Sequence, residues 1–151
     1  LAEAADARNP LILRGETLRQ ADECAAKNAE NSLTDVPTRE IHYINMRRQQ
    51  RRILLQVTQD AQKVQGHPPQ EAEVRALIGR IFAEYDREND CTSLLSALHD
   101  LLAEMQRQPL PATRGEFEDR ALLYVLLRRM EDFLLLKREF YETYGFEKIT
   151  N

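Results

Sequence analysis

Four arginines stand close together in the segment MRRQQRRILLQV, which runs from Met46 to Val57. A guanidinium group stays charged and pairs with carboxylates or phosphates through two parallel hydrogen bonds. The chain as a whole has a net charge of −4, whereas residues 38–65 hold six basic and two acidic residues, a net charge of +4. The cluster therefore stands out from its chain, and its chemistry fits an acidic protein, a nucleic acid, an anionic lipid or the phosphates of a nucleotide.

A helical arrangement of this segment separates the arginines from the apolar residues. At 100° per residue, an apolar stripe forms one face, and its members are Tyr43, Met46, Ile53, Leu54, Val57, Ala61 and Val64. The opposite sector holds Arg48, Arg51 and Arg52 together with Ile44 and Leu55. Basic groups among exposed aliphatic side chains are typical of protein interfaces. We therefore predict that these five residues bind another protein with an acidic surface.

Three other interpretations of the same residues compete with this one. The arginines can pair within the chain, because residues 66–107 carry four basic and eight acidic residues. One arginine can act on a nucleotide hydrolase by stabilising charge on a transferring phosphate. The third interpretation is weak binding of nucleic acid or anionic lipid. It is disfavoured by the sequence pI near 5.5 and by the lack of a basic motif interleaved with aromatic residues.

The remaining chemistry-bearing residues form no recognisable site. The three histidines, His42, His67 and His99, belong to no H-E-x-x-H or E-x-x-H unit, and Cys24 and Cys91 stand far apart. No phosphate-binding glycine loop and no nucleophile motif is present in the sequence. We therefore expect no catalytic residue, no cofactor and no metal, and a chain that is not an enzyme.

The elements that position the arginines are predicted to be helices throughout. Low glycine content and many Leu, Ala, Arg, Glu and Gln residues favour helix. We predict an all-α, single-domain bundle over residues 1–151 with about five helices, beginning near residues 10, 38, 71, 92 and 114. The second of these helices is expected to run from about Thr38 to Gln65. Residues 1–9 are expected to fray.

The fifth helix carries the clearest local signals. Thr113 and Glu116 form a capping-box pattern, and Gly145 is a natural stop. Between them, the stretch LLYVLLRRMEDFLLLKREF is apolar on nearly every side, so we expect a long helix that is largely buried among its neighbours or contributes to an interface. Two L-x-x-L-L strings, beginning at Leu98 and Leu123, coincide with the apolar stripes and are interpreted as core.

The chain contains no apolar run close to the ~20 residues that a membrane-spanning helix requires. Two cysteines without a paired spacing favour reduced thiols and a cytoplasmic location. The first residue is Leu1 rather than Met, so we expect that the chain can be part of a longer protein.

Overall fold

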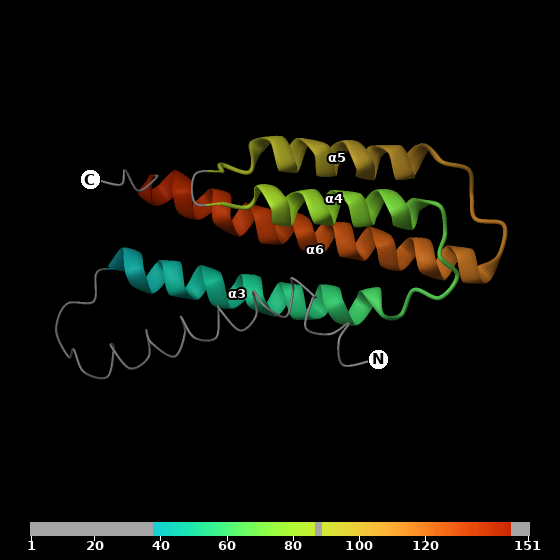
Figure 1. Ribbon diagram of the computed structural model, residues 1–151, viewed down its shortest axis with the longest axis horizontal. Coiled ribbons are helices and arrows are strands. Elements are labelled where there is room, and N and C mark those ends of the chain that lie inside the picture. The colour runs from blue at the N-terminus through green and yellow to red at the C-terminus, as the bar shows by residue number, and fades with distance from the viewer. Residues whose placement is uncertain (1–37, 87–88, 146–151) are drawn as a thin grey trace. The chain divides into compact units, whose positions relative to one another are not determined.

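The computed structural model describes residues 38–86 and 89–145. These residues form four helices and no strand (Figure 1), and the helices are α3 (Thr38–Ala61), α4 (Gln70–Glu84), α5 (Thr92–Arg107) and α6 (Arg114–Tyr144). The all-α class is thus confirmed for the described part of the chain. The predicted count of five is not reached there, because the helix expected from Asn9-Pro10 lies outside the described residues.

The chain divides into two compact units, Leu1–Leu54 and Leu55–Asn151. Helix α3 passes from the first unit into the second, and α4, α5 and α6 belong wholly to the second. The prediction of a single domain stays a prediction.

Helix α3 buries a narrower and more polar stripe than its apolar residues predict. Met46, Leu54 and Val57 are buried as expected, whereas Tyr43 is 39% exposed. Gln50 and Asp60 share the buried face and expose only 0% and 7% of their surface. Hydrogen bonds within α3 and to α6 account for these two polar residues, as described below.

In the second unit, α4, α5 and α6 pack pairwise around one apolar core (Figure 1). Its most deeply buried members come from all three helices, and they are Ile81, Leu94, Leu98, Leu127, Met130 and Leu134. Phe133 of α6 adds ring contacts with Phe82 and Tyr85, at centroid distances of 6.4 and 5.1 Å. Burial of these side chains in the three-helix core is the main stabilising contribution of this unit.

Both L-x-x-L-L strings lie in this core. Leu98 and Leu102 are buried, as are Leu123, Leu126 and Leu127. Their interpretation as core is confirmed.

The ends of α6 follow the local sequence signals. The Glu116 N–H donates to Thr113 Oγ1 at 3.1 Å, and Glu116 Oε2 accepts from the Ala112 N–H at 2.9 Å. The reciprocal bond thus reaches one residue further back than in the usual capping box. At the other end, Gly145 has φ +72° and donates its N–H to the Tyr141 carbonyl at 2.8 Å. Both predicted ends are confirmed.

Helix α6 is long, as expected, but it is buried on one face only. Its buried residues occupy one face, whereas Phe117, Val125 and Leu135 on another face are 60%, 38% and 42% exposed. The apolar content of this helix therefore exceeds what its contacts with α4 and α5 cover.

Candidate functional site

The five residues predicted to bind a partner all lie on α3. Arg48 and Arg52 are exposed, and Leu55 is 56% exposed. Arg51 and Ile44 are half-buried. Leu55 belongs to the second compact unit and the other four to the first. Three of the five residues are thus exposed to solvent, and two are half-buried.

The buried face of α3 is polar at its centre. Gln50 is completely buried, and its Oε1 accepts a hydrogen bond from Arg47 Nη1 at 3.1 Å. Arg47, which the sequence groups with the other three arginines, is half-buried and engaged on this side. The arginine cluster is therefore divided, because Arg47 supports the buried face and Arg48 and Arg52 remain exposed.

In the second unit, the last turn of α3 is tied to α6 by an ion cluster around Asp60. Lys63 Nζ lies 2.6 Å from Asp60 Oδ1, and Arg129 Nε lies 3.0 Å from Asp60 Oδ2. Arg129 also donates through Nη1 to Gln56 Oε1 at 2.7 Å. The hydrogen bond from Lys63, together with the positive charges of Lys63 and Arg129, holds the pKa of Asp60 below its ordinary value.

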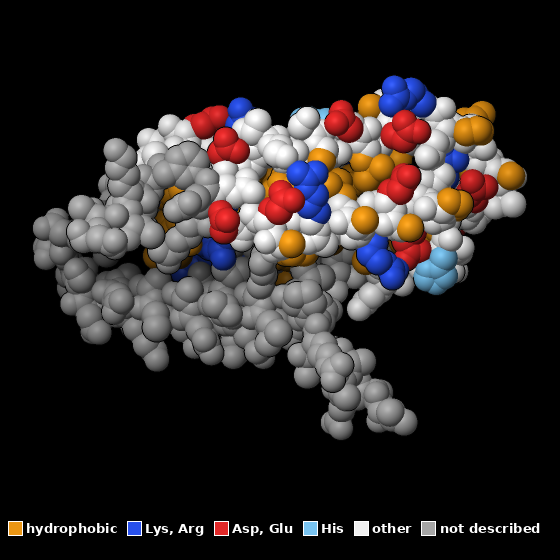
Figure 2. All heavy atoms as spheres, turned by 45° about the horizontal axis from the view of Figure 1, so that its top comes forward, with side chains coloured by type: hydrophobic (Ala, Val, Ile, Leu, Met, Phe, Trp, Pro, Cys, Tyr) orange, Lys and Arg blue, Asp and Glu red, His pale blue; other side chains and the backbone are white. Residues whose placement is uncertain are grey.

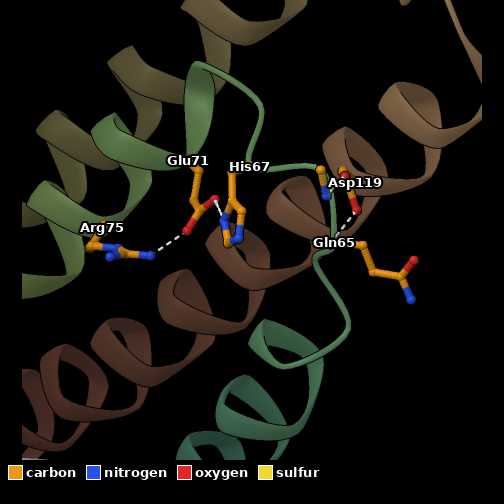
Figure 3. Close-up of polar contacts among 6 residues, drawn as sticks. Gln65, His67, Glu71, Arg75 and Asp119 are labelled. Atoms are coloured by element: carbon orange, nitrogen blue, oxygen red, sulfur yellow. Dashed lines mark hydrogen bonds and ion pairs between the residues drawn. The ribbon is translucent and has the colours of Figure 1, made fainter.

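A polar groove of about 740 Å³ lies in the second unit, where the turn after α3 meets the first turns of α6. Asp119, which is 6% exposed, accepts the N–H groups of Gln65 at 3.0 Å and Gly66 at 2.7 Å (Figure 3). A Cβ atom on Gly66 would stand 2.7 Å from Asp119 Oδ2. Only glycine therefore fits this turn without a shift.

The start of α4 contributes a second polar group beside the turn. His67 Nδ1 lies 2.7 Å from Glu71 Oε2, and Arg75 pairs with the other oxygen of the same carboxylate (Figure 3). The hydrogen bond with His67, followed by the one from Arg75, lowers the pKa of Glu71. Lys63 and His67 line the groove together with three carboxylates, which belong to Glu116, Glu118 and Asp119.

A buried cation was missed by the sequence reasoning. Lys137 on α6 is 2% exposed, and its Nζ donates to the Asp86 carbonyl. The same Nζ lies 4.2 Å from the ring centroid of Tyr85 and 5.6 Å from that of Tyr141. These cation–π contacts and the carbonyl bond fix the connection after α4 onto α6.

The thiol of Cys91 is free and fully buried. Burial raises its pKa above the ordinary thiol value, which keeps the group protonated and unreactive near neutral pH. Cys24 lies outside the described residues.

Among residues 38–86 and 89–145, no group of three His, Cys, Asp or Glu side chains is placed to hold a metal ion. Within the same ranges, no helix combines the length and the apolar character needed to cross a membrane.

Taken together, these features define an all-helical domain with an arginine-bearing exposed helix face and a polar groove. The chain belongs to the family described as "Putative aromatic acid exporter C-terminal domain", which matches residues 3–138. It is 28% identical over 125 residues to the protein named "Uncharacterized protein YqjA" from Bacillus subtilis (strain 168), a match that covers 83% of this chain and 39% of YqjA. The chain thus spans about two-fifths of the length of this curated relative.

A solved structure shares the fold. It is described as "Crystal structure of putative membrane protein from Clostridium difficile 630" and aligns with a TM-score of 0.74 at 24% identity. The alignment covers 85% of this chain and 77% of that one.

Proposed function

We propose that this chain is the C-terminal helical domain of an exporter-type protein for aromatic acids, and that it acts by binding protein rather than by catalysis. The observation that carries the proposal is the family match, which extends over residues 3–138. The match to only 39% of YqjA fits a domain that works beside a larger partner region of the same polypeptide.

The exposed part of α3 is the proposed contact surface. Arg48 and Arg52 are exposed residues of α3, and Leu55 adds an exposed apolar side chain. An acidic segment of the exporter would pair with the guanidinium groups of both arginines while covering the leucine. We assign the domain to the cytoplasmic side of the membrane, and the free thiol of Cys91 is compatible with that reducing compartment.

The test measures export by the natural polypeptide that carries these residues. Bacterial cells are loaded with radiolabelled benzoate, and the rate of its release is compared for the unchanged protein, a version without residues 38–145, and the double reversal Arg48→Glu/Arg52→Glu. If α3 couples the domain to the exporter, both altered proteins release benzoate more slowly at equal membrane abundance.

The matched control is Arg75→Glu/Arg107→Glu, which makes the same charge change at side chains that are 77% and 72% exposed on α4 and α5. This control should keep the full rate. Export at the full rate without the domain would contradict a role in transport. Equal losses in both double reversals would assign the effect to net charge rather than to α3.

A further inference from the structure

The outer face of α6 carries a continuous exposed stripe that its contacts with α4 and α5 leave uncovered. Its members recur every three or four residues and fall within a sector of about 80° at 100° per residue, and they are Phe117, Ala121, Val125, Arg128, Asp132, Leu135 and Glu139. All seven are exposed. Single exposed apolar residues are ordinary on protein surfaces, whereas a row along one helix is typical of an interface.

The apolar members define the length of this stripe. Phe117 and Leu135 are 60% and 42% exposed and lie near its two ends, with Val125 between them. Eighteen residues of α-helix separate the ends by about 27 Å. On the face drawn in Figure 2, basic and acidic side chains lie interspersed among apolar ones.

The charges along the stripe differ between its two halves. Arg114 flanks its start, with a side chain that is 91% exposed and that pairs through Nε with Glu118 Oε1 of its own chain at 2.9 Å. Asp132 and Glu139 occupy the C-terminal half, and neither carboxylate has an ion-pair partner among residues 38–86 and 89–145. A parallel neighbour would set like charges against each other, whereas an antiparallel neighbour sets Arg114 against Glu139.

We propose that this stripe binds a second copy of the chain, with the two α6 helices antiparallel about a two-fold axis near Val125 and Arg128. One register satisfies the apolar and the charged members together. It places Phe117 opposite Leu135 of the second copy, Arg114 opposite its Glu139, and Val125 opposite its Arg128. Each contact occurs twice because a two-fold interface is self-complementary.

The central arginines do not oppose this arrangement. Arg128 Nη1 is 2.8 Å from Glu131 Oε2, and its guanidinium group also contacts Tyr124. Each Arg128 is therefore neutralised within its own chain before it approaches the axis. A single helix face of this length gives an interface at the small end of the specific range, so association is weak and depends on concentration.

Crosslinking of mixed variants tests both the contact and its direction. The full chain is prepared as Phe117→Cys and as Leu135→Cys, each with Cys24→Ser, and one of the two variants carries a mass tag. Cys91 is retained because it is fully buried. Oxidation of the mixture should give a disulfide mainly between the two different variants. Dimers of Phe117→Cys alone would show parallel helices and overturn the proposal.

Ala103→Cys on α5 supplies the background of random crosslinking, since this residue is exposed outside the stripe. Crosslinking no stronger than this background, with a single monomeric species in sedimentation at every concentration, would also overturn the proposal.

Charge exchange gives an independent readout. Arg114→Glu and Glu139→Arg should each weaken dimerisation about tenfold, because two exposed ion pairs become like-charge contacts. The combined variant should restore it, since the opposite charges then face each other again. A combined variant weaker than either single one would contradict the register.

Discussion

The turn after α3 allows a quantitative test of how α6 holds it. Asp119→Ala removes the carboxylate that accepts the N–H groups of Gln65 and Gly66 at 3.0 and 2.7 Å. Hydrogen bonds to charged groups contribute ~1.5–3 kcal/mol each, and water replaces part of them at this exposed turn. We therefore expect Asp119→Ala to lower the free energy of unfolding by about 2–3 kcal/mol.

Gly66→Ala perturbs the same contact from the other side. The new Cβ would lie 2.7 Å from Asp119 Oδ2, and relieving such overlap costs about 1–3 kcal/mol. The backbone of Gly66 does not have a positive φ, so the overlap alone decides the cost. In the Asp119→Ala background the carboxylate that meets the new Cβ is absent. Gly66→Ala should then change the free energy of unfolding by no more than about 0.5 kcal/mol.

Urea unfolding of the four proteins, followed by far-ultraviolet circular dichroism, completes this double-mutant cycle. We expect a coupling energy of about 1–3 kcal/mol between the two sites. Additive effects, with Gly66→Ala equally costly in both backgrounds, would refute the contact as the reason for glycine.

Three further predictions concern the cap, the core and the ion cluster. Thr113→Ala should lower the free energy of unfolding by about 1 kcal/mol through loss of the α6 cap, with Thr113→Ser closer to the original in urea unfolding. Leu126→Asp should abolish the cooperative thermal transition because the residue is 3% exposed, whereas Val125→Asp, at 38% exposure, should keep it. Arg129→Met should lower the free energy of unfolding at pH 7. The difference in free energy of unfolding between this variant and the original should shrink below pH 3.8, the ordinary pKa of Asp60, because a carboxyl with a lowered pKa stabilises only while it is ionised.

Local signals were sufficient for most of the fold. The capping residues Thr113 and Glu116 and the stop at Gly145 act within a few positions of themselves, so the ends of α6 could be read directly. Apolar spacing located α4 and α5 for the same reason. The end of α3 was placed at Gln65 by sequence and lies at Ala61 in the structure. The Gln65 N–H does not continue the helix, because it donates instead to the carboxylate of Asp119, which lies 54 positions away in the sequence.

Buried polar residues were the main omission. Gln50, Asp119 and Lys137 each occupy the register of a buried stripe, at helical spacing from apolar neighbours such as Leu54 and Leu123. A polar residue at a buried position of a helix can therefore be recognised from the sequence, and it is expected to have a buried hydrogen-bond partner. The identity of the partner depends on the tertiary contact, which the local sequence does not contain.

The helical wheel predicts the exposure of the five proposed binding residues only in part. It placed Arg48 and Arg52 correctly in the exposed sector, but it also placed Arg51 and Ile44 there, and the structure half-buries both. A wheel treats one helix alone, and neighbouring segments decide how wide the exposed sector is.

The central claim is that the exposed face of α3 contacts an acidic region of an exporter. Site-specific photocrosslinking in the natural polypeptide tests this claim most directly, with a photoreactive residue at position 52 and a control at position 75 on α4. We expect a discrete crosslink from position 52 that maps to an acidic segment outside residues 38–145, is lost with Arg48→Glu, and is absent from position 75. Equal diffuse labelling from both positions, or crosslinks from position 52 only to lipid or nucleic acid, would contradict it.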